Sequence, residues 1–184
     1  MKEINIELLV QQIQAGKIKK FEKLIDYYKH RLYGYIFKQV RNKEDSEDVL
    51  QEVFIKVYRK LDQYDSEQNF TSWIVTITRN TIMDYFRRKK PKSELIDDLD
   101  MVDSETPEKV FLEKSFSRVL DNKISQLPDK YRELILLKYF EELTYDEISI
   151  TLSMPINQVK WQLHQARKKL MVLSEQEVRL WNAK

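Results

Sequence analysis

The segment from Leu143 to Leu170 has the pattern of two helices joined by a tight turn, and it constrains the fold more than any other part of the chain. Thr144 and Glu147 have the spacing of a capping box, which starts a helix by satisfying two backbone N–H groups. Pro155 then opens a second helix, in which apolar residues recur at every third or fourth position. These are Ile156, Val159, Leu163, Ala166 and Leu170. We predict a helix-turn-helix over this segment.

The second of these helices carries a polar and aromatic stripe opposite its apolar face. Its members are Trp161, His164, Gln165 and Lys168. Hydrogen-bond donors, an acceptor and a flat ring on one stripe suit the edges of base pairs in a major groove. An ordinary helical hairpin is the alternative, because Arg167, Lys168 and Lys169 also suit the C-terminal end of a helix electrostatically.

Glycine and proline are scarce, with two and four copies among the 184 residues, and this scarcity predicts an all-α protein. A β-rich chain of this length would need many more turn-forming residues. The absence of cysteine excludes disulfides, thiolate catalysis and cysteine metal sites. No apolar run of about 18 residues occurs and the N-terminus lacks an apolar signal core, so we expect a cytoplasmic protein without membrane insertion.

Charge divides the chain into three segments, although the net charge is only +2. Residues 1–91 and 114–184 are each net positive, whereas residues 92–113 carry eight acidic and two basic side chains. This acidic stretch shows no sustained helical period, and repulsion among its carboxylates should keep it extended. We therefore predict two small helical domains, joined by an acidic flexible linker at residues 92–113, with the helix-turn-helix in the second domain.

Four helical segments are expected in the first domain, at about residues 4–14, 18–40, 42–61 and 70–91. The third carries an acidic stripe on its outer face, formed by Asp45, Asp48, Gln51 and Glu52. Like charges three and four residues apart on a helix repel one another. Such a stripe in a basic domain is typical of a docking site for a basic protein partner, and a merely solvated helix face is the alternative.

The fourth segment ends in four consecutive basic residues before Pro91. It combines aromatic side chains with arginine and asparagine, and its threonines are poor helix formers, which indicates a role for their side chains. Aromatic rings can stack on unpaired bases, amides can read base edges and guanidinium groups can bind phosphate. These features favour a surface for single-stranded nucleic acid, and a helix with a core of aromatic residues is the alternative.

Four motifs follow one another along nearly the whole chain. They are DSEDVLQEVFIKVYRKL, FTSWIVTITRNTIMDYFRRKK, LPDKYRELILLKYFEELTYDEI and INQVKWQLHQARKKL. Their order and spacing resemble bacterial RNA polymerase sigma factors of the sigma-70 family, in the small two-domain extracytoplasmic-function (ECF) group. The resemblance implies a transcription initiation factor that binds core RNA polymerase, recognises the minus-ten and minus-thirty-five promoter elements and helps to melt the DNA. It also implies an anti-sigma factor as a partner, and neither a cofactor nor enzymatic activity.

The resemblance assigns each candidate surface to a ligand. The acidic stripe of Asp45, Asp48, Gln51 and Glu52 corresponds to the surface that docks on the clamp helices of the polymerase β′ subunit, with the β subunit as a further contact. The residues that correspond to the surface for the minus-ten element are Phe70, Trp73, Arg79, Asn80, Asp84, Tyr85, Arg87 and Arg88. The residues that correspond to the surface for the minus-thirty-five duplex are Lys160, Trp161, His164, Gln165, Arg167 and Lys168.

The second helix of the helix-turn-helix departs from its usual sequence in this group. Small and basic residues are usual where this chain has Trp161, Gln162 and Gln165. Bidentate contacts from arginine to guanine are thereby lost, whereas glutamine can pair with adenine. We therefore expect an altered preference for the minus-thirty-five sequence.

Two other classes of protein are open at the level of the residues. A helix-turn-helix regulator with an unrelated N-terminal helical domain would share the C-terminal pattern, but it would not need the acidic stripe or the basic aromatic helix. A metalloenzyme would need a ligand cluster, and the one pair at a suitable spacing is Asp26 and His30. With only one further histidine in the chain, we expect no metal site.

Overall fold

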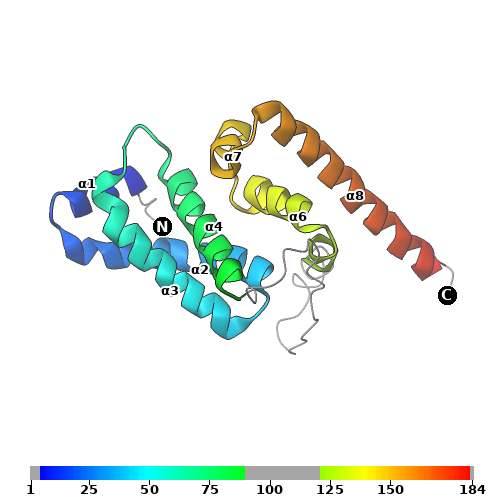
Figure 1. Cartoon of the computed structure of the whole chain (residues 1–184), viewed down its shortest axis with the longest axis horizontal. Helices are drawn as coiled ribbons and strands as arrows, with labels where there is room; N and C mark the ends of the chain where they lie inside the picture. The colour runs from blue at the N-terminus through cyan, green and yellow to red at the C-terminus, as the bar shows by residue number, and fades with distance from the viewer. Residues whose placement is uncertain (1–4, 90–120, 183–184) are drawn as a thin grey trace. The chain divides into compact units, whose positions relative to one another are not determined.

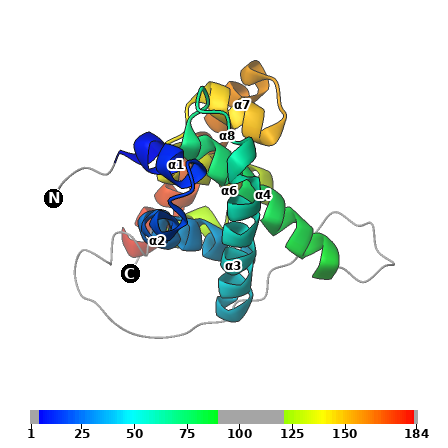
Figure 2. The same cartoon turned by 90° about the vertical axis from the view of Figure 1, so that its left-hand side faces the viewer.

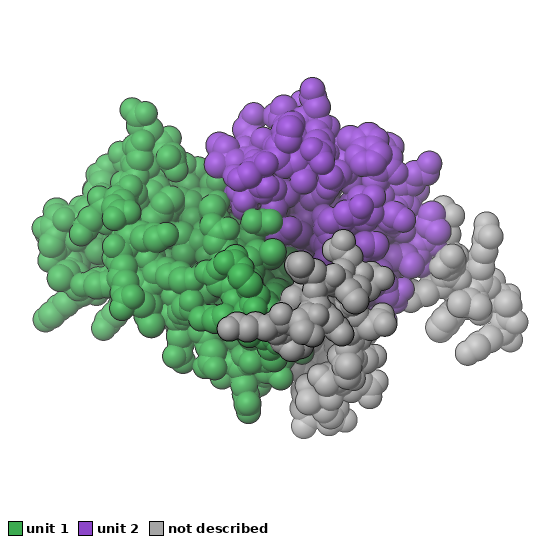
Figure 3. Space-filling view, viewed as in Figure 1, with its two compact units in different colours: residues 1–98 green, residues 99–184 purple. Residues whose placement is uncertain are grey.

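The computed structural model describes residues 5–89 and 121–182, with side chains described up to residue 173. The chain divides into two compact units, Met1–Asp98 and Leu99–Lys184, which Figure 3 distinguishes by colour. Within the described ranges the regular elements are all helical, so the predicted all-α class is confirmed. The predicted linker at residues 92–113 lies outside the described residues, and its boundaries remain a prediction.

The first unit is built from the helices α1 to α4, which Figures 1 and 2 label, and from two short 3₁₀ turns. In chain order they are α1 (Ile6–Gln14), η1 (Ile18–Lys20), α2 (Phe21–Val40), α3 (Lys43–Lys60), η2 (Leu61–Gln63) and α4 (Phe70–Lys89). The four helical segments predicted from the sequence are present, with bounds that agree to within about three residues.

Asparagine side chains fix where three of these helices begin. The side-chain oxygen of Asn42 accepts a hydrogen bond from the backbone N–H of Asp45 at 3.0 Å. The side-chain oxygen of Asn69 accepts one from the N–H of Ser72 at 3.1 Å in the same way. Asn5 does the same at the start of α1. Each asparagine satisfies a backbone donor that the helix itself leaves without a partner.

The core of the first unit lies among α2, α3 and α4, which pack against one another. Its fully buried apolar side chains include Leu24, Leu32, Ile36, Val53, Val57, Ile74 and Val75. Burial of this apolar surface fixes the rotation of each helix about its axis. The acidic outer face of α3 consequently lies beside the C-terminal half of α4.

Three of the threonines of α4 form side-chain hydrogen bonds to the backbone of their own helix. The hydroxyls of Thr76, Thr78 and Thr81 donate to the carbonyl oxygens four residues earlier at 2.8–2.9 Å. Thr78 and Thr81 are buried, so their hydroxyls satisfy the helix backbone within the core and do not face a ligand.

The second unit contains a short helical segment at residues 121–125 followed by the helix-turn-helix. The elements after residue 125 are α6 (Asp129–Ile135), the π-helical turn η3 (Leu136–Phe140), α7 (Tyr145–Leu152) and α8 (Ile156–Asn182). The predicted capping box is confirmed, because Thr144 and Glu147 bond reciprocally at the start of α7. Ser153 closes α7 with a left-handed φ of 50°, which makes the tight turn into α8.

Apolar contacts and one buried arginine hold this unit together. Val159, Leu163 and Ala166 on α8 are fully buried, as the helical spacing predicts, and α8 packs on α6 and α7. Arg132 of α6 is only 5% exposed. Its guanidinium donates to the carbonyl oxygens of residues 124, 125 and 127 at 2.8–3.4 Å, which ties the segment at 121–125 to α6.

In the part of the chain that the structure describes, no helix is both long and apolar enough to cross a bilayer. The same residues contain no group of three or more side chains that could hold a metal ion. Asp26, one of the two residues considered as metal ligands, forms an ion pair with Lys29 at 2.7 Å.

Candidate nucleic-acid and partner interfaces

The acidic stripe of α3 divides into exposed and half-buried members. Asp48 and Gln51 are exposed, whereas Asp45 and Glu52 lie half-buried against α4. Asp48 forms no ion pair with the residues that the structure describes. The exposed pair is therefore available to a ligand, and the half-buried pair already has partners within the protein.

Asp45 and Glu52 form ion pairs with the basic end of α4. Lys89 donates to the carboxylate of Asp45 at 2.6 Å, and Arg88 donates to the carboxylate of Glu52 at 2.6 Å. Lys89 also donates to the hydroxyl of Tyr85 at 2.7 Å. The two ion pairs between α3 and α4 join residues that are 36 and 44 positions apart in the sequence.

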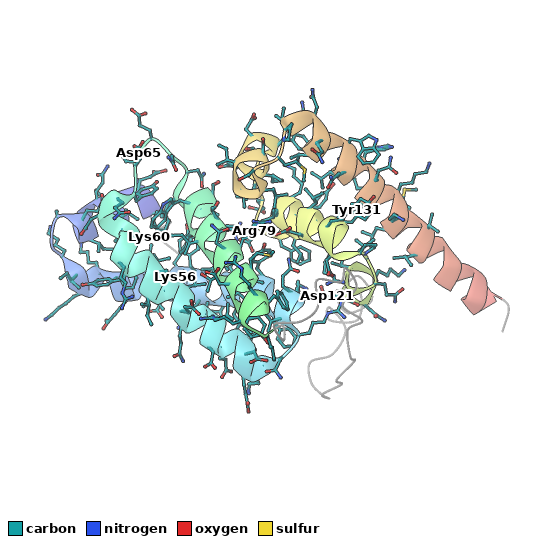
Figure 4. The ribbon with its side chains drawn as sticks, in the orientation of Figure 1. Lys56, Lys60, Asp65, Arg79, Asp121 and Tyr131 are labelled. Atoms are coloured by element: carbon teal, nitrogen blue, oxygen red, sulfur yellow. The ribbon has the colours of Figure 1, made fainter. Side chains whose placement is uncertain are left out.

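Lys56 lies between the two helices and continues this network; Figure 4 labels it on α3. Its ammonium contacts Glu52 at 2.9 Å and Asp84 of α4 at 3.1 Å. Asp84 in turn contacts Arg87 at 3.3 Å. Lys56 was not among the site residues predicted from the sequence. Its position four residues after Glu52 indicates the first contact, whereas the contact with Asp84 depends on how α3 packs on α4.

The network shifts the titration of its carboxylates and of Lys56. Hydrogen bonds from Lys89 to Asp45, from Arg88 to Glu52 and from Lys56 to Asp84 lower the pKa of each carboxyl. Burial alone would lower the pKa of Lys56, but hydrogen bonds with Glu52 and Asp84 outweigh it and raise that pKa. These groups are therefore charged at neutral pH.

Exposed apolar residues extend the face of α3 on which Asp48 and Gln51 lie. Ile55 is 51% exposed and Tyr58 is 46% exposed. They follow Gln51 at intervals of four and three residues, so all four side chains share one stripe. The helical spacing in the sequence could have located both residues, because they fall outside the apolar stripe that α3 buries. A partially apolar stripe bordered by charge is typical of a protein interface.

The predicted minus-ten residues occupy different environments on α4. Asn80, Arg87 and Arg88 are exposed, and Arg79, which Figure 4 labels on α4, is half-buried. Met83 is also exposed and lies one turn after Asn80, although the sequence interpretation did not single it out.

The aromatic residues at the start of α4 form a cluster of their own. Phe70 is only 3% exposed and packs against Tyr28, Tyr64 and Trp73, with ring centroids 5.0–5.7 Å apart. Trp73 is half-buried and also contacts Tyr64. Phe70 therefore supports the cluster from within the core, and Trp73 is the member of the predicted pair with accessible surface.

The outward stripe of α8 begins with two accessible residues. Trp161 is 58% exposed, and His164 one turn later is exposed as well. Gln165 is half-buried, and with Lys168 it lines a groove of about 450 Å³ beside residues 126–128. The predicted stripe is thus divided between an exposed edge and the wall of this groove.

Three cationic side chains contact Tyr145, which lies at the start of α7 and next to α8. The ammonium groups of Lys138 and Lys160 lie 5.0 and 5.9 Å from the centre of its ring. Arg167 donates to its hydroxyl at 3.4 Å. Tyr145 thus holds two of the predicted site residues, Lys160 and Arg167, on the α7 side of α8.

Two all-helical units, one with an acidic face beside a basic helix end and one with a helix-turn-helix, are typical of a nucleic-acid-binding protein that has a protein partner. Family comparisons specify this class. Residues 24–92 match the family model for Sigma-70 region 2, and residues 117–170 match that for Sigma-70, region 4. The helix-turn-helix regulator with an unrelated N-terminal domain is therefore not favoured, because the first unit matches a sigma region.

Whole-chain relatives agree with this assignment. The chain is 32% identical over 179 residues to the ECF RNA polymerase sigma factor SigW of Bacillus subtilis (strain 168), covering 91% of this chain and 96% of that protein. It is 28% identical over 173 residues to the ECF RNA polymerase sigma-E factor of Escherichia coli (strain K12), covering 88% and 90%. The chain belongs to the ECF sigma factors of the sigma-70 family, and it is a transcription initiation factor that directs RNA polymerase to promoters.

Solved structures share the fold. The structure of CnrH in complex with the cytosolic domain of CnrY aligns with a TM-score of 0.68 at 21% identity, covering 92% of this chain and 96% of that one. The sigma factor RpoE of Bartonella quintana, in complex with the anti-sigma factor NepR, aligns with a TM-score of 0.65 at 18% identity, covering 85% and 98%.

Proposed function

We propose that the exposed face of α3 docks this factor on core RNA polymerase, at the clamp helices of the β′ subunit, with the β subunit as a further contact. Asp48 supplies an accessible charge, and Gln51, Ile55 and Tyr58 supply polar and apolar contacts on the same stripe. The exposure of Asp48 on the same helical stripe as two large exposed apolar side chains, Ile55 and Tyr58, is the observation that carries this proposal.

The exposed part of α4 handles the minus-ten element in this proposal. Asn80 can read the edge of an unpaired base, Trp73 offers a ring for stacking, and Arg87 and Arg88 can contact phosphates. Arg79, Asp84 and Tyr85 support these contacts from half-buried positions. Phe70 contributes by packing against Trp73 and not by touching DNA.

In this proposal the helix-turn-helix binds the minus-thirty-five duplex, and α8 is the recognition helix. Trp161 and His164 face the base edges, because they are exposed and lie one turn apart. Lys160, Arg167 and Lys168 contact phosphates, which positions the helix without selecting sequence. Gln165 reads a base from the rim of the groove that it lines.

An anti-sigma factor is the proposed regulatory partner. One structural neighbour of this chain, the Bartonella quintana sigma factor, is bound to an anti-sigma factor in its solved structure, and this supports the proposal. We place the factor in the cytoplasm, where bacterial RNA polymerase and promoter DNA are, and assign it no catalytic activity. The two sigma regions correspond to proposed domains at residues 1–91 and 114–184.

The docking proposal is tested by replacing Asp48 with arginine and measuring binding to purified core RNA polymerase. Charge reversal at an exposed residue should leave the helical content unchanged and weaken binding at least about tenfold, because it puts like charges across the interface. Glu22→Arg on α2 makes the same change in net charge away from the stripe and serves as the control. Equal binding by both variants would remove α3 from the polymerase interface.

A further inference from the structure

Two ion pairs join the acidic stripe of α3, next to the surface proposed for polymerase, to the basic end of α4, which is proposed for the minus-ten element. Asp45 and Glu52 belong to the acidic stripe of α3, whereas Arg88 belongs to the basic end of α4, together with Lys89. In the structure of the chain alone, the two carboxylates bind the two cations at 2.6 Å each. A carboxylate that holds Arg88 is less available to a basic partner, and an arginine held by a carboxylate is less available to phosphate.

The geometry allows this network to open from the solvent side. The side chains of Asp45 and Glu52 are 27% and 30% exposed, whereas those of Lys89 and Arg88 are 59% and 61% exposed. The carboxylates are thus held against the protein while the cations reach over them from a helix end. Ion pairs with such exposed members are weak, so a competing charge can replace either partner.

The remaining contacts of the network show what would stay in place. Lys56 bridges Glu52 and Asp84 across α3 and α4, and its side chain is 29% exposed. It would keep the two helices joined and Glu52 oriented after Arg88 has left. Opening therefore frees the end of α4 without separating it from α3.

We propose that the ion pairs from Asp45 to Lys89 and from Glu52 to Arg88 couple polymerase docking to the capture of promoter DNA. In the free factor, the carboxylates of α3 hold both cations. When basic groups of polymerase bind Asp45 and Glu52, Arg88 and Lys89 are released to bind the phosphates of the minus-ten strand. By linkage, DNA bound to these cations strengthens docking by the same factor. The coupling rests on the proposed function of the two surfaces.

The first test measures the affinity of the full-length factor, without polymerase, for a fluorescently labelled single-stranded oligothymidine at low ionic strength. Phosphate contacts are independent of sequence, so this probe reports on freed cations. Asp45→Asn with Glu52→Gln should bind about two- to tenfold more tightly than a control that loses two unpaired charges of α3, which follows from the weakness of exposed ion pairs. The control is Glu44→Gln with Asp48→Asn, and equal affinities of the two variants would overturn the coupling.

A second background separates released cations from a general change in charge. In a chain that already carries Arg88→Gln and Lys89→Gln, neutralising Asp45 and Glu52 should give no gain over the control pair. An undiminished gain in this background would also overturn the coupling, because the cations would not be its source. If neither the wild type nor any variant binds the probe at low salt, the basic end of α4 does not bind nucleic acid, and the coupling fails with it.

The reciprocal test measures binding to core RNA polymerase without DNA. Arg88→Gln should strengthen docking about two- to fivefold relative to Arg87→Gln, because Arg88 competes for Glu52 whereas Arg87 contacts Asp84. Equal affinities of these two variants, with Asp48→Arg still weakening docking, would reject the coupling and leave the proposed docking surface intact. If Asp48→Arg docks normally as well, the docking proposal and the coupling both fail.

Discussion

Residues on α4 differ in exposure because one side of the helix packs against the core and the other faces solvent. Phe70 lies in an aromatic cluster in the core, whereas Asn80, nearly three turns later, is exposed. An exposed amide in the middle of a helix gains little from packing, so its side chain is free to bind a ligand.

At this scale we predict the effect of Asn80→Ala. If the amide captures an unpaired minus-ten base, its loss should make the free energy of open-complex formation less favourable by about 1–3 kcal/mol on duplex promoters. The loss should be smaller on a pre-melted template. Permanganate reactivity of the promoter measures melting directly. Met83→Ala, one turn away on the exposed side of α4, is the matched control. Identical reactivity for wild type and Asn80→Ala would remove Asn80 from the site.

At the scale of the elements, the second unit is held together by the hydrogen bonds of one buried arginine as well as by its apolar core. Arg132 binds three carbonyl oxygens at the end of the segment before α6. We expect Arg132→Ala to lower the free energy of unfolding by about 2–4 kcal/mol, because buried carbonyls lose their donors. Urea unfolding followed by circular dichroism measures this loss. Arg132→Lys should recover little of it, since an ammonium lacks the planar fork; full recovery would mean that charge alone matters.

The ion pairs between α3 and α4 predict how the first unit responds to acid. Asp45, Glu52 and Asp84 have pKa values below their ordinary values of 3.8 for aspartate and 4.5 for glutamate, owing to hydrogen bonds from Lys89, Arg88 and Lys56. A carboxyl whose pKa is lower in the folded state stabilises the fold above its unfolded-state pKa, and this contribution is lost as the pH falls through the folded-state pKa.

The measurement compares the Tm of wild type with that of the variant Asp45→Asn, Glu52→Gln across pH. The wild type should be the more stable of the two at pH 6, and the difference should shrink steadily below about pH 4. High salt at pH 6 should shrink it too, because the pairs are exposed. A difference that stays constant down to pH 2 would show that the ion pairs do not contribute.

At the scale of the whole molecule, each unit has its own buried core, among α2, α3 and α4 in the first and among α6, α7 and α8 in the second. We predict that the two units fold independently. A chain cut by an inserted protease site within residues 92–113 should give two fragments whose circular dichroism spectra sum to that of the intact chain. A large loss of helical signal after cleavage would contradict this and indicate one cooperative fold.

The sequence by itself determined the helices and their starts, because the signals for both are local. Apolar residues at three- and four-residue spacing predict helices, and asparagine or a capping box marks where a helix begins within four residues of chain. Thr144 and Glu147 form the predicted box, and Val159, Leu163 and Ala166 are buried as their spacing requires. The family also followed from the sequence, since its motifs extend along nearly the whole chain.

Only the tertiary structure decided which of the candidate site residues are accessible and which of them touch. Helical spacing places Phe70 on the same helix as Asn80, but the phenylalanine is buried by the ring of Tyr28, which is distant in the sequence, and by that of Tyr64 in the turn before α4. Arg88 meets Glu52 across 36 positions because apolar burial fixes how α3 and α4 rotate against each other. Contacts between helices depend on that rotation, which no local pattern encodes.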